Sequence, residues 1–178
     1  DWAGLQNHLM TVGLNTWRMQ ASPKRVMHTN APLFNNGVRN DPFADGRVRA
    51  VGLYAQDDMR FGALGIVAGL RHDRVNGSAA SINNGAVTQG LDRSDSATTG
   101  SLGAMVEVQP LLRPYANLSR AFRAADMRER FESSPRGDGY FYVGNPQLRP
   151  EQATQLELGI KGEDKEFSYS VSAYRSRI

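Results

Sequence analysis

Apolar and polar residues alternate with a period of two along most of this chain, and no other feature constrains its fold so strongly. Between residues 154 and 162, Leu156, Leu158 and Ile160 fall on one side of an extended backbone, and their polar neighbours fall on the other. Strict alternation of this kind indicates strands with one apolar and one polar face. The pattern predicts about seven strands, at residues 8–22, 47–60, 63–76, 97–109, 112–124, 153–162 and 166–177.

The connections between these strands alternate in length. Strands longer than five or six residues, with short turns at one end and long loops at the other, are typical of an outer-membrane β-barrel. A soluble β-sandwich is the alternative, and it would bury the apolar face inside the protein. Strand length and the rhythm of the connections favour an all-β, antiparallel up-and-down barrel sheet. The short turns are predicted near 60–63, 109–112 and 162–165, and the long polar loops at 23–46, 77–96 and 125–152.

In such a barrel the apolar face meets lipid and the polar face lines the lumen, which fixes the direction of each side chain. The convex, lipid-facing set is predicted to be Leu53, Leu64, Ile66, Val106, Leu156, Leu158, Ile160, Phe167, Tyr169 and Val171. The concave set is predicted to be Tyr54, Gln56, Arg71, Asp73, Glu107, Gln155, Glu157, Lys161 and Ser170. We expect at least one carboxylate–guanidinium contact among the lumen charges, namely Asp58, Arg60, Arg71, Asp73, Glu107, Glu157 and Lys161.

Composition excludes several other classes. The chain has no cysteine, so disulfides and thiolate metal sites are excluded. Its longest apolar stretch, 63–70, is far shorter than the roughly 20 residues of a transmembrane helix. The net charge of +3 is scattered, so a nucleic-acid-binding surface is not indicated. No signal peptide opens the chain, and seven strands do not close an even-numbered barrel, so we expect a segment of a larger protein.

Four segments resemble motifs of the TonB-dependent outer-membrane receptors, in the same order and at similar spacing. Residues 52–60 and 69–74 resemble the paired "YAQDE…GLRYD" strands, and residues 114–124 resemble "YASYSRGFRAP". Residues 144–151 are similar to "GNPxLKPE", and residues 155–161 to "YELGLK". The resemblance covers nearly the whole chain, most strongly from Gly52 onward. In two departures, His72 replaces the usual tyrosine, and Ala125 replaces the usual proline, which predicts a slightly longer preceding strand.

The resemblance implies a bacterial outer-membrane location and a barrel of about 22 strands with an N-terminal plug in its lumen. Residues 1–178 would be part of that barrel, and the plug with its TonB-contacting segment has no counterpart in this chain. The implied function is active import of a scarce nutrient, such as a ferric siderophore or another metal chelate, energised through TonB. The alternatives are a passive porin-like channel, or a copper, haem or vitamin B12 receptor. No cofactor is expected.

The loop at 125–152 is the candidate ligand contact, because it would lie outside the cell above the lumen. Its aromatic rings could stack on a flat ligand, and its arginines could pair with an anionic chelate. The alternative is that the rings pack the loop against its neighbours. Haem receptors of this family carry a histidine in this region, and the interval from Phe122 to Leu148 has none. The candidate residues are Arg128, Arg130, Arg136, Tyr140, Phe141 and Tyr142.

Other residues are weaker candidates for a functional site. Met27 and His28, with Met19 nearby, are soft potential ligands for copper, although such a grouping is common by chance. Lys24 and Arg25 could contact lipopolysaccharide phosphates at the outer rim. An outer-membrane lipase or protease would need a catalytic triad or dyad. The loop carboxylates are interleaved with arginines, and no nucleophile elbow is visible, so no catalytic residue and no enzyme is predicted.

Overall fold

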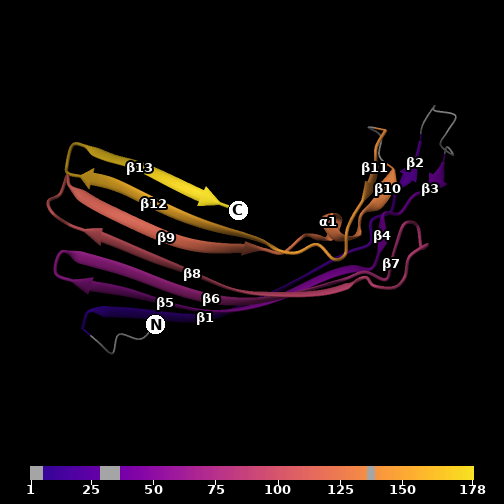
Figure 1. The fold of residues 1–178 in the computed structure, drawn as a ribbon, viewed down its shortest axis with the longest axis horizontal. Helices are drawn as coiled ribbons and strands as arrows, with labels where there is room; N and C mark the ends of the chain where they lie inside the picture. Colours follow the sequence, from indigo (N-terminus) through magenta and orange to yellow (C-terminus); the bar gives the residue numbers. More distant parts are fainter. Residues whose placement is uncertain (1–5, 29–36, 136–138) are drawn as a thin grey trace.

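The computed structural model describes residues 6–28, 37–135 and 139–178. Seven long strands form one antiparallel sheet, and each pairs with the next long strand in the chain. Figure 1 shows them as one curved layer, with the short turns at the left end and the longer connections at the right. In sheet order the strands are β1 (His8–Ala21), β5 (Gly46–Phe61), β6 (Leu64–Ser78), β8 (Asp92–Val106), β9 (Arg113–Arg123), β12 (Glu151–Glu163) and β13 (Ser168–Arg177).

This up-and-down order confirms the predicted fold class, and the described residues form an open sheet with β1 and β13 at its edges. Most strand ends lie within two residues of the prediction, and β8 differs most. It begins at Asp92, five residues before the predicted start at 97, and ends at Val106, three residues before the predicted end at 109. β9 ends at Arg123, so the prediction that Ala125 lengthens this strand was wrong. Asp126 instead caps the N-terminus of a short helix, α1 (Met127–Phe131), which turns the chain away from the sheet.

The short turns lie where the alternation predicts them. Between β5 and β6, Gly62 has a φ of +61°, which suits the first central residue of a two-residue hairpin turn. Between β12 and β13, the Asp164 carboxylate accepts hydrogen bonds from the backbone N–H groups of Glu166 (2.9 Å) and Phe167 (2.8 Å). These two bonds lower the pKa of Asp164 because they favour its ionised form.

The longer connections contain short elements of their own. No helix in the described part of the chain is long and apolar enough to cross a membrane. The small strand pairs are β2 (Val26–Met27) with β3 (Val38–Arg39), β4 (Phe43–Ala44) with β7 (Ser81–Ile82), and β10 (Ser133–Pro135) with β11 (Phe141–Val143).

The strand register separates the two faces of the sheet as predicted. Leu102, Leu118 and Leu156 lie directly opposite one another on β8, β9 and β12, which builds one continuous apolar row. The alternate residues, such as Gln155 and Ser119, form a polar row on the other face. α1 lies on the polar side, within the concavity of the sheet (Figure 1). The register therefore places the predicted apolar residues of the strands on the convex face. Phe167, just before the start of β13, stacks on Tyr169 of this face.

One ionisable pair breaks the apolar face. Asp57 lies opposite Met10 and Ala68, in the same row as the leucines. One of its carboxylate oxygens contacts His8 Nδ1 at 2.7 Å, and the other is buried without a hydrogen-bond partner. His8 also meets the ring of Phe61 edge-on, at 5.8 Å between centroids. Alternation alone did not reveal this pair, because the two residues are 49 positions apart.

The two faces predict opposite responses to one substitution. Leu118→Arg should destabilise the protein by about 2–4 kcal/mol, because a charged side chain would face lipid near mid-strand. Ser119→Arg, one residue further on, should change stability little, because this side chain faces a hollow of 310 Å³ on the concave side. The measurement is the free energy of unfolding in phospholipid vesicles, from urea titrations. Equal losses in both variants would contradict the assignment of the faces.

Candidate ligand-binding site

The long connections pack together at one end of the sheet as one unit, here called the outer cap. It comprises the described residues of 22–45, 79–91 and 124–150. Three connections contribute to its apolar core, which rests on the concave face of β5 and β6. α1 lies close over Gly46 and Gly77, where the sheet offers no side chain to hold it off. The buried core residues are Phe43, Ile82, Leu91, Met127 and Phe131, against Val48, Ala50 and Val75.

A buried ion pair fixes α1 to the sheet. The side chains of Arg130 on α1 and Asp95 on β8 are only 2% and 3% exposed, and a close charge-assisted hydrogen bond joins them. Arg130 Nε also donates to the carbonyl of Ala125 at 3.0 Å. Arg93 Nε donates to the second oxygen of Asp95 at 2.9 Å. The guanidinium of Arg130 thus serves the interior of the outer cap and is not presented to solvent.

A second set of polar contacts joins the first connection to the third. Arg25 donates to Ser134 Oγ at 2.8 Å and to Glu132 at 3.2 Å, and both acceptors are buried. Asp41 accepts the backbone N–H of Arg25 at 2.9 Å, and this bond is the main reason why its pKa is lowered. Lys24 lies 3.5 Å from the same carboxylate. Of the two predicted lipopolysaccharide contacts, Arg25 is therefore engaged within the cap, whereas the Lys24 side chain is 61% exposed.

The start of α1 is tied to the end of β9. Asp126 and Glu129 form a capping box, in which each side chain accepts a hydrogen bond from the backbone N–H of the other residue. Arg123 donates two hydrogen bonds of 3.0 Å to Glu129, and a third to Glu151 at 3.0 Å. The bonds from Arg123 lower the pKa of Glu129 more than any other influence. The chain therefore leaves the sheet in one defined direction.

The predicted aromatic contacts lie on a small hairpin that projects from the cap (Figure 1). Tyr142 pairs with Ser134, and Phe141 with Pro135, in the β10–β11 ladder. Tyr140, Phe141 and Tyr142 are 72%, 54% and 40% exposed, so the hairpin presents large ring surfaces to solvent. Arg128 is also exposed, on the outside of α1. Arg136 lies outside the described residues.

The concave face below the cap carries paired polar side chains. Arg71 makes two hydrogen bonds of 2.7 Å to Asp73, and Arg60 contacts Glu107 at 2.6 Å. These contacts confirm the predicted pairing of carboxylates and guanidinium groups on this face.

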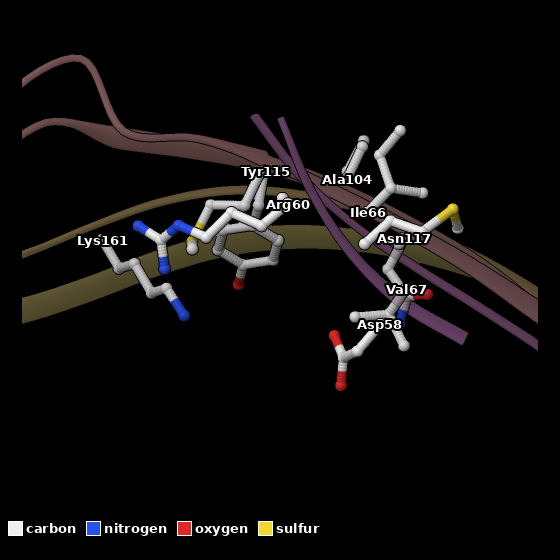
Figure 2. Close-up of a pocket in the computed structure, with 13 residues that line it drawn as sticks. Asp58, Arg60, Ile66, Val67, Ala104, Tyr115, Asn117 and Lys161 are labelled. Atoms are coloured by element: carbon white, nitrogen blue, oxygen red, sulfur yellow. The ribbon is translucent and has the colours of Figure 1, made fainter. Parts of the chain in front are cut away.

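A hollow of 490 Å³ opens on the same face, toward the short-turn end. Figure 2 shows Arg60, Lys161 and Tyr115 on one side of it, and Asp58 with Asn117 on the other. The Tyr115 hydroxyl donates to Glu157 at 3.0 Å. Lys161 Nζ lies 5.9 Å from the centroid of the Tyr115 ring. The face is therefore charged but largely neutralised, which suits a water-filled or protein-filled lumen better than a lipid contact.

Tyrosines on this face lie over glycines of the neighbouring strand. Tyr54 is opposite Gly13, and Tyr115 is opposite Gly159. A Cβ atom built at Gly159 would lie 2.4 Å from Cζ of Tyr115, so only glycine leaves room for the ring. The sequence analysis did not foresee these pairs, because each partner occupies an ordinary lumen-facing position and only the register brings them together.

The model of the TonB-dependent receptor-like β-barrel family matches residues 1–178. The chain belongs to this family. Its members are transport receptors of the outer membrane of Gram-negative bacteria. In an outer-membrane barrel the concave face is the lumen wall and the convex face meets lipid. The outer cap of this receptor chain therefore stands over the lumen.

Solved structures agree with the family assignment. The copper transporter OprC is similar to the chain with a TM-score of 0.72 and 17% identity, over 96% of this chain and 27% of that one. The Serratia marcescens haemophore receptor HasR is similar with a TM-score of 0.64 and 15% identity, over 95% of this chain and 34% of that one. The FrpB iron transporter of Neisseria meningitidis is similar with a TM-score of 0.67 and 13% identity, over 97% of this chain and 26% of that one. The chain thus spans about a quarter to a third of these proteins, and at such identities the likeness shows the fold alone. No curated protein matches the chain.

Of the metal-ligand candidates, the structure describes the side chains of Met19 and His28. Met19 lies on β1 and is 56% exposed, and His28 is exposed just after β2. The side chain of Met27 lies outside the described residues. In the described parts of the chain, no three residues among His, Cys, Asp and Glu are placed to hold a metal ion.

The contrast between two neighbouring arginines predicts how the cap is held. Arg130→Ala should leave one oxygen of the buried Asp95 carboxylate without its cationic partner, while Arg93 still holds the other oxygen, so the local stability of the cap should fall by about 2–4 kcal/mol. Arg128→Ala is the matched control on the same helix, and it should have little effect. The measurement is amide hydrogen exchange of residues 127–135 in the detergent-solubilised receptor. Faster exchange is expected in Arg130→Ala alone, and partial recovery when Asp95→Ala is added. Unchanged exchange in Arg130→Ala would show that the apolar core alone holds α1 in place and that the ion pair is not needed.

Proposed function

We propose that this receptor binds an anionic metal chelate, such as a ferric siderophore, on its outer cap and imports it with energy supplied through TonB. The observation that carries the proposal is the exposed aromatic hairpin, held by a buried polar anchor above the lumen face. Exposed rings are costly to maintain in water, and an aromatic face offers a catecholate or another planar chelate a large contact area.

The hairpin is preorganised for binding. Ser134, opposite Tyr142 in the ladder, is 1% exposed and is held by Arg25. A ligand that stacks on these rings therefore loses little free energy to ordering the β10–β11 backbone. Arg128 adds an exposed positive charge nearby on α1, which suits the negative charge of most metal chelates. Arg130 acts in this proposal as a positioning residue, because its guanidinium is committed to Asp95.

The similar structures bear printed names that link them to copper, haem and iron. These names support a metal-containing ligand as a class, and they show that proteins of one fold are linked to copper, haem and iron. We infer that the residues of the outer cap decide which of these ligands this receptor binds. We favour a chelate over free copper because the exposed rings and Arg128 lie on one hairpin and on the helix that precedes it.

Removing the rings should weaken ligand binding. The variant Tyr140→Ala/Phe141→Ala/Tyr142→Ala should raise the Kd for the chelate at least about tenfold, because each productive ring contributes roughly 1 kcal/mol. The assay is binding of radiolabelled catecholate and hydroxamate ferric siderophores, haem and cupric ion to receptor in outer-membrane vesicles. Phe167→Ala removes an exposed ring at the opposite end of the sheet and should bind as the unmodified receptor does. An unchanged Kd in a well-folded triple variant would exclude the hairpin as the binding site.

An uptake assay distinguishes an active receptor from a passive channel. Import of the bound chelate should stop when TonB is deleted or the proton gradient is collapsed, while surface binding continues, because binding needs only the cap. A porin-like channel would continue to admit the solute at the same rate in both conditions. Uptake that survives loss of TonB would therefore contradict the proposed active transport and leave the binding site as a separate question.

A further inference from the structure

Four arginines lie together on the convex face at the long-loop end of the sheet. Arg18 on β1 lies directly opposite Arg49 on β5. Arg47 lies on the same face of β5, two residues before Arg49. On β6, Arg74 lies two residues before Asn76, the residue directly opposite Arg49. All four side chains are exposed. We call this group the arginine patch.

The burial pattern fixes the side of the sheet on which the patch lies. Along β5, Arg47 and Arg49 are exposed, while Val48 and Ala50 between and beside them are buried under the outer cap. On β6, Arg74 precedes Val75, which is buried in the same core. The patch therefore faces away from the cap and the lumen. It shares the convex face with Leu53, the apolar residue four positions further along β5.

The height of the patch follows from strand geometry. Phe61 ends β5 at the short turn, Leu53 lies eight residues before it, and Arg49 lies twelve before it. At about 3.3 Å per residue and a tilt of about 40°, Leu53 is roughly 20 Å and Arg49 roughly 30 Å above that turn. The apolar band of such barrels is about 25 Å tall. The patch therefore lies at the outer boundary of the hydrocarbon, at the level of outer-leaflet headgroups.

Among the described residues, no carboxylate neutralises the charges of the patch. Arg18 donates to Gln20 at 2.9 Å, and no salt bridge joins the four arginines to a carboxylate in the described part of the chain. Like charges directly opposite each other destabilise a strand pair. β5 and β6 are interior strands with both neighbours in place, so closing the barrel would insert no side chain between Arg49 and Arg74.

The surroundings of the patch suit phosphate. Ser96 lies opposite Arg74, Ser94 lies opposite Asn76, and Gln20 lies opposite Arg47, so neutral donors surround the arginines. Asp92, the carboxylate in the row of Arg47, is separated from it by Ser78. Guanidinium groups bind phosphate through paired, charge-assisted hydrogen bonds, and several together relieve their mutual repulsion on an anion.

We propose that the arginine patch binds the phosphate groups of the phosphorylated glycolipid in the outer leaflet, lipopolysaccharide, and so forms a lipid site on the outside of the receptor. The site is independent of nutrient binding, because it lies on the opposite face from the outer cap. It is distinct from Lys24 and Arg25 in the first connection, of which Arg25 is held by buried acceptors inside the cap. Acyl chains of the bound lipid would lie along the apolar convex face next to the patch, which begins on β5 with Val51 and Leu53.

The test compares two variants that each lose two positive charges. Arg49→Gln/Arg74→Gln removes the centre of the patch. Arg149→Gln/Lys165→Gln is the control, since both residues are exposed and lie in the connection before β12 and in the β12–β13 turn. Each purified receptor is placed in phosphatidylethanolamine nanodiscs and titrated with bisphosphorylated lipid A. The patch variant should bind at least about tenfold more weakly, and the control should match the unmodified receptor.

Two further measurements on the unmodified receptor keep the proposal falsifiable if the patch variant fails to fold. Lipid A without phosphates should bind at least about tenfold more weakly than the phosphorylated form, since the arginines would have no anion to pair with. Free inorganic phosphate should not displace the phosphorylated lipid, because the lipid is also held by its acyl chains. Equal binding of both lipids, equal binding by patch variant and control, or displacement by free phosphate would each overturn the proposal.

Discussion

Backbone hydrogen bonding is the constraint on which the rest of this structure depends. In lipid, each N–H and C=O group of a strand must pair with a neighbouring strand, because the bilayer core offers no water. Consecutive antiparallel strands of 10 to 16 residues satisfy this requirement with short connections at one end. Once the strands are paired continuously, successive side chains along each strand point to opposite faces of the sheet. One face then meets lipid and the other meets the lumen. The exposed apolar row of Leu102, Leu118 and Leu156 would be a fault in a soluble sheet, and it is the natural surface in a membrane.

The polar face uses a different principle, because its side chains must be packed without an apolar core. Glycines opposite tyrosines let rings such as Tyr54 and Tyr115 lie flat on the sheet, where they support charged neighbours. Carboxylates and cations then pair along and across strands, so the lumen wall is polar without a large net charge. The buried pair of Arg130 and Asp95 extends this pairing to the outer cap. There, a desolvated ion pair gives a defined position to a helix of five residues that could not be stable by itself.

The sequence was sufficient to predict the strands and their faces, and it was insufficient where contacts depend on register or tertiary packing. Alternation predicted all seven long strands, because each has an apolar side that must meet lipid. It placed the start of β8 five residues late, because Ser94 and Ser96 lie above the apolar band and carry no hydrophobic signal. The outer cap was predicted as loops alone, since its core joins residues from three distant connections. Arg128 and Arg130 looked equivalent in sequence, and only the packing of α1 shows that one is exposed and the other is buried.

β5 shows how one strand can serve several environments through position and parity alone. Its even-numbered residues contact the outer cap at Val48 and line the lumen at Tyr54 and Asp58. Its odd-numbered residues face lipid at Leu53 and reach the outer-leaflet boundary at Arg49. A shift of the register by one residue would place Arg49 beneath α1 and Val48 at the level of the headgroups. Both changes would be unfavourable, since one buries an unpaired charge and the other removes a cation from an anionic surface. The arginine patch therefore adds to the specificity of the fold. It makes the register shifted by one residue unfavourable at the outer end of β5, where the alternation of apolar and polar residues is weak.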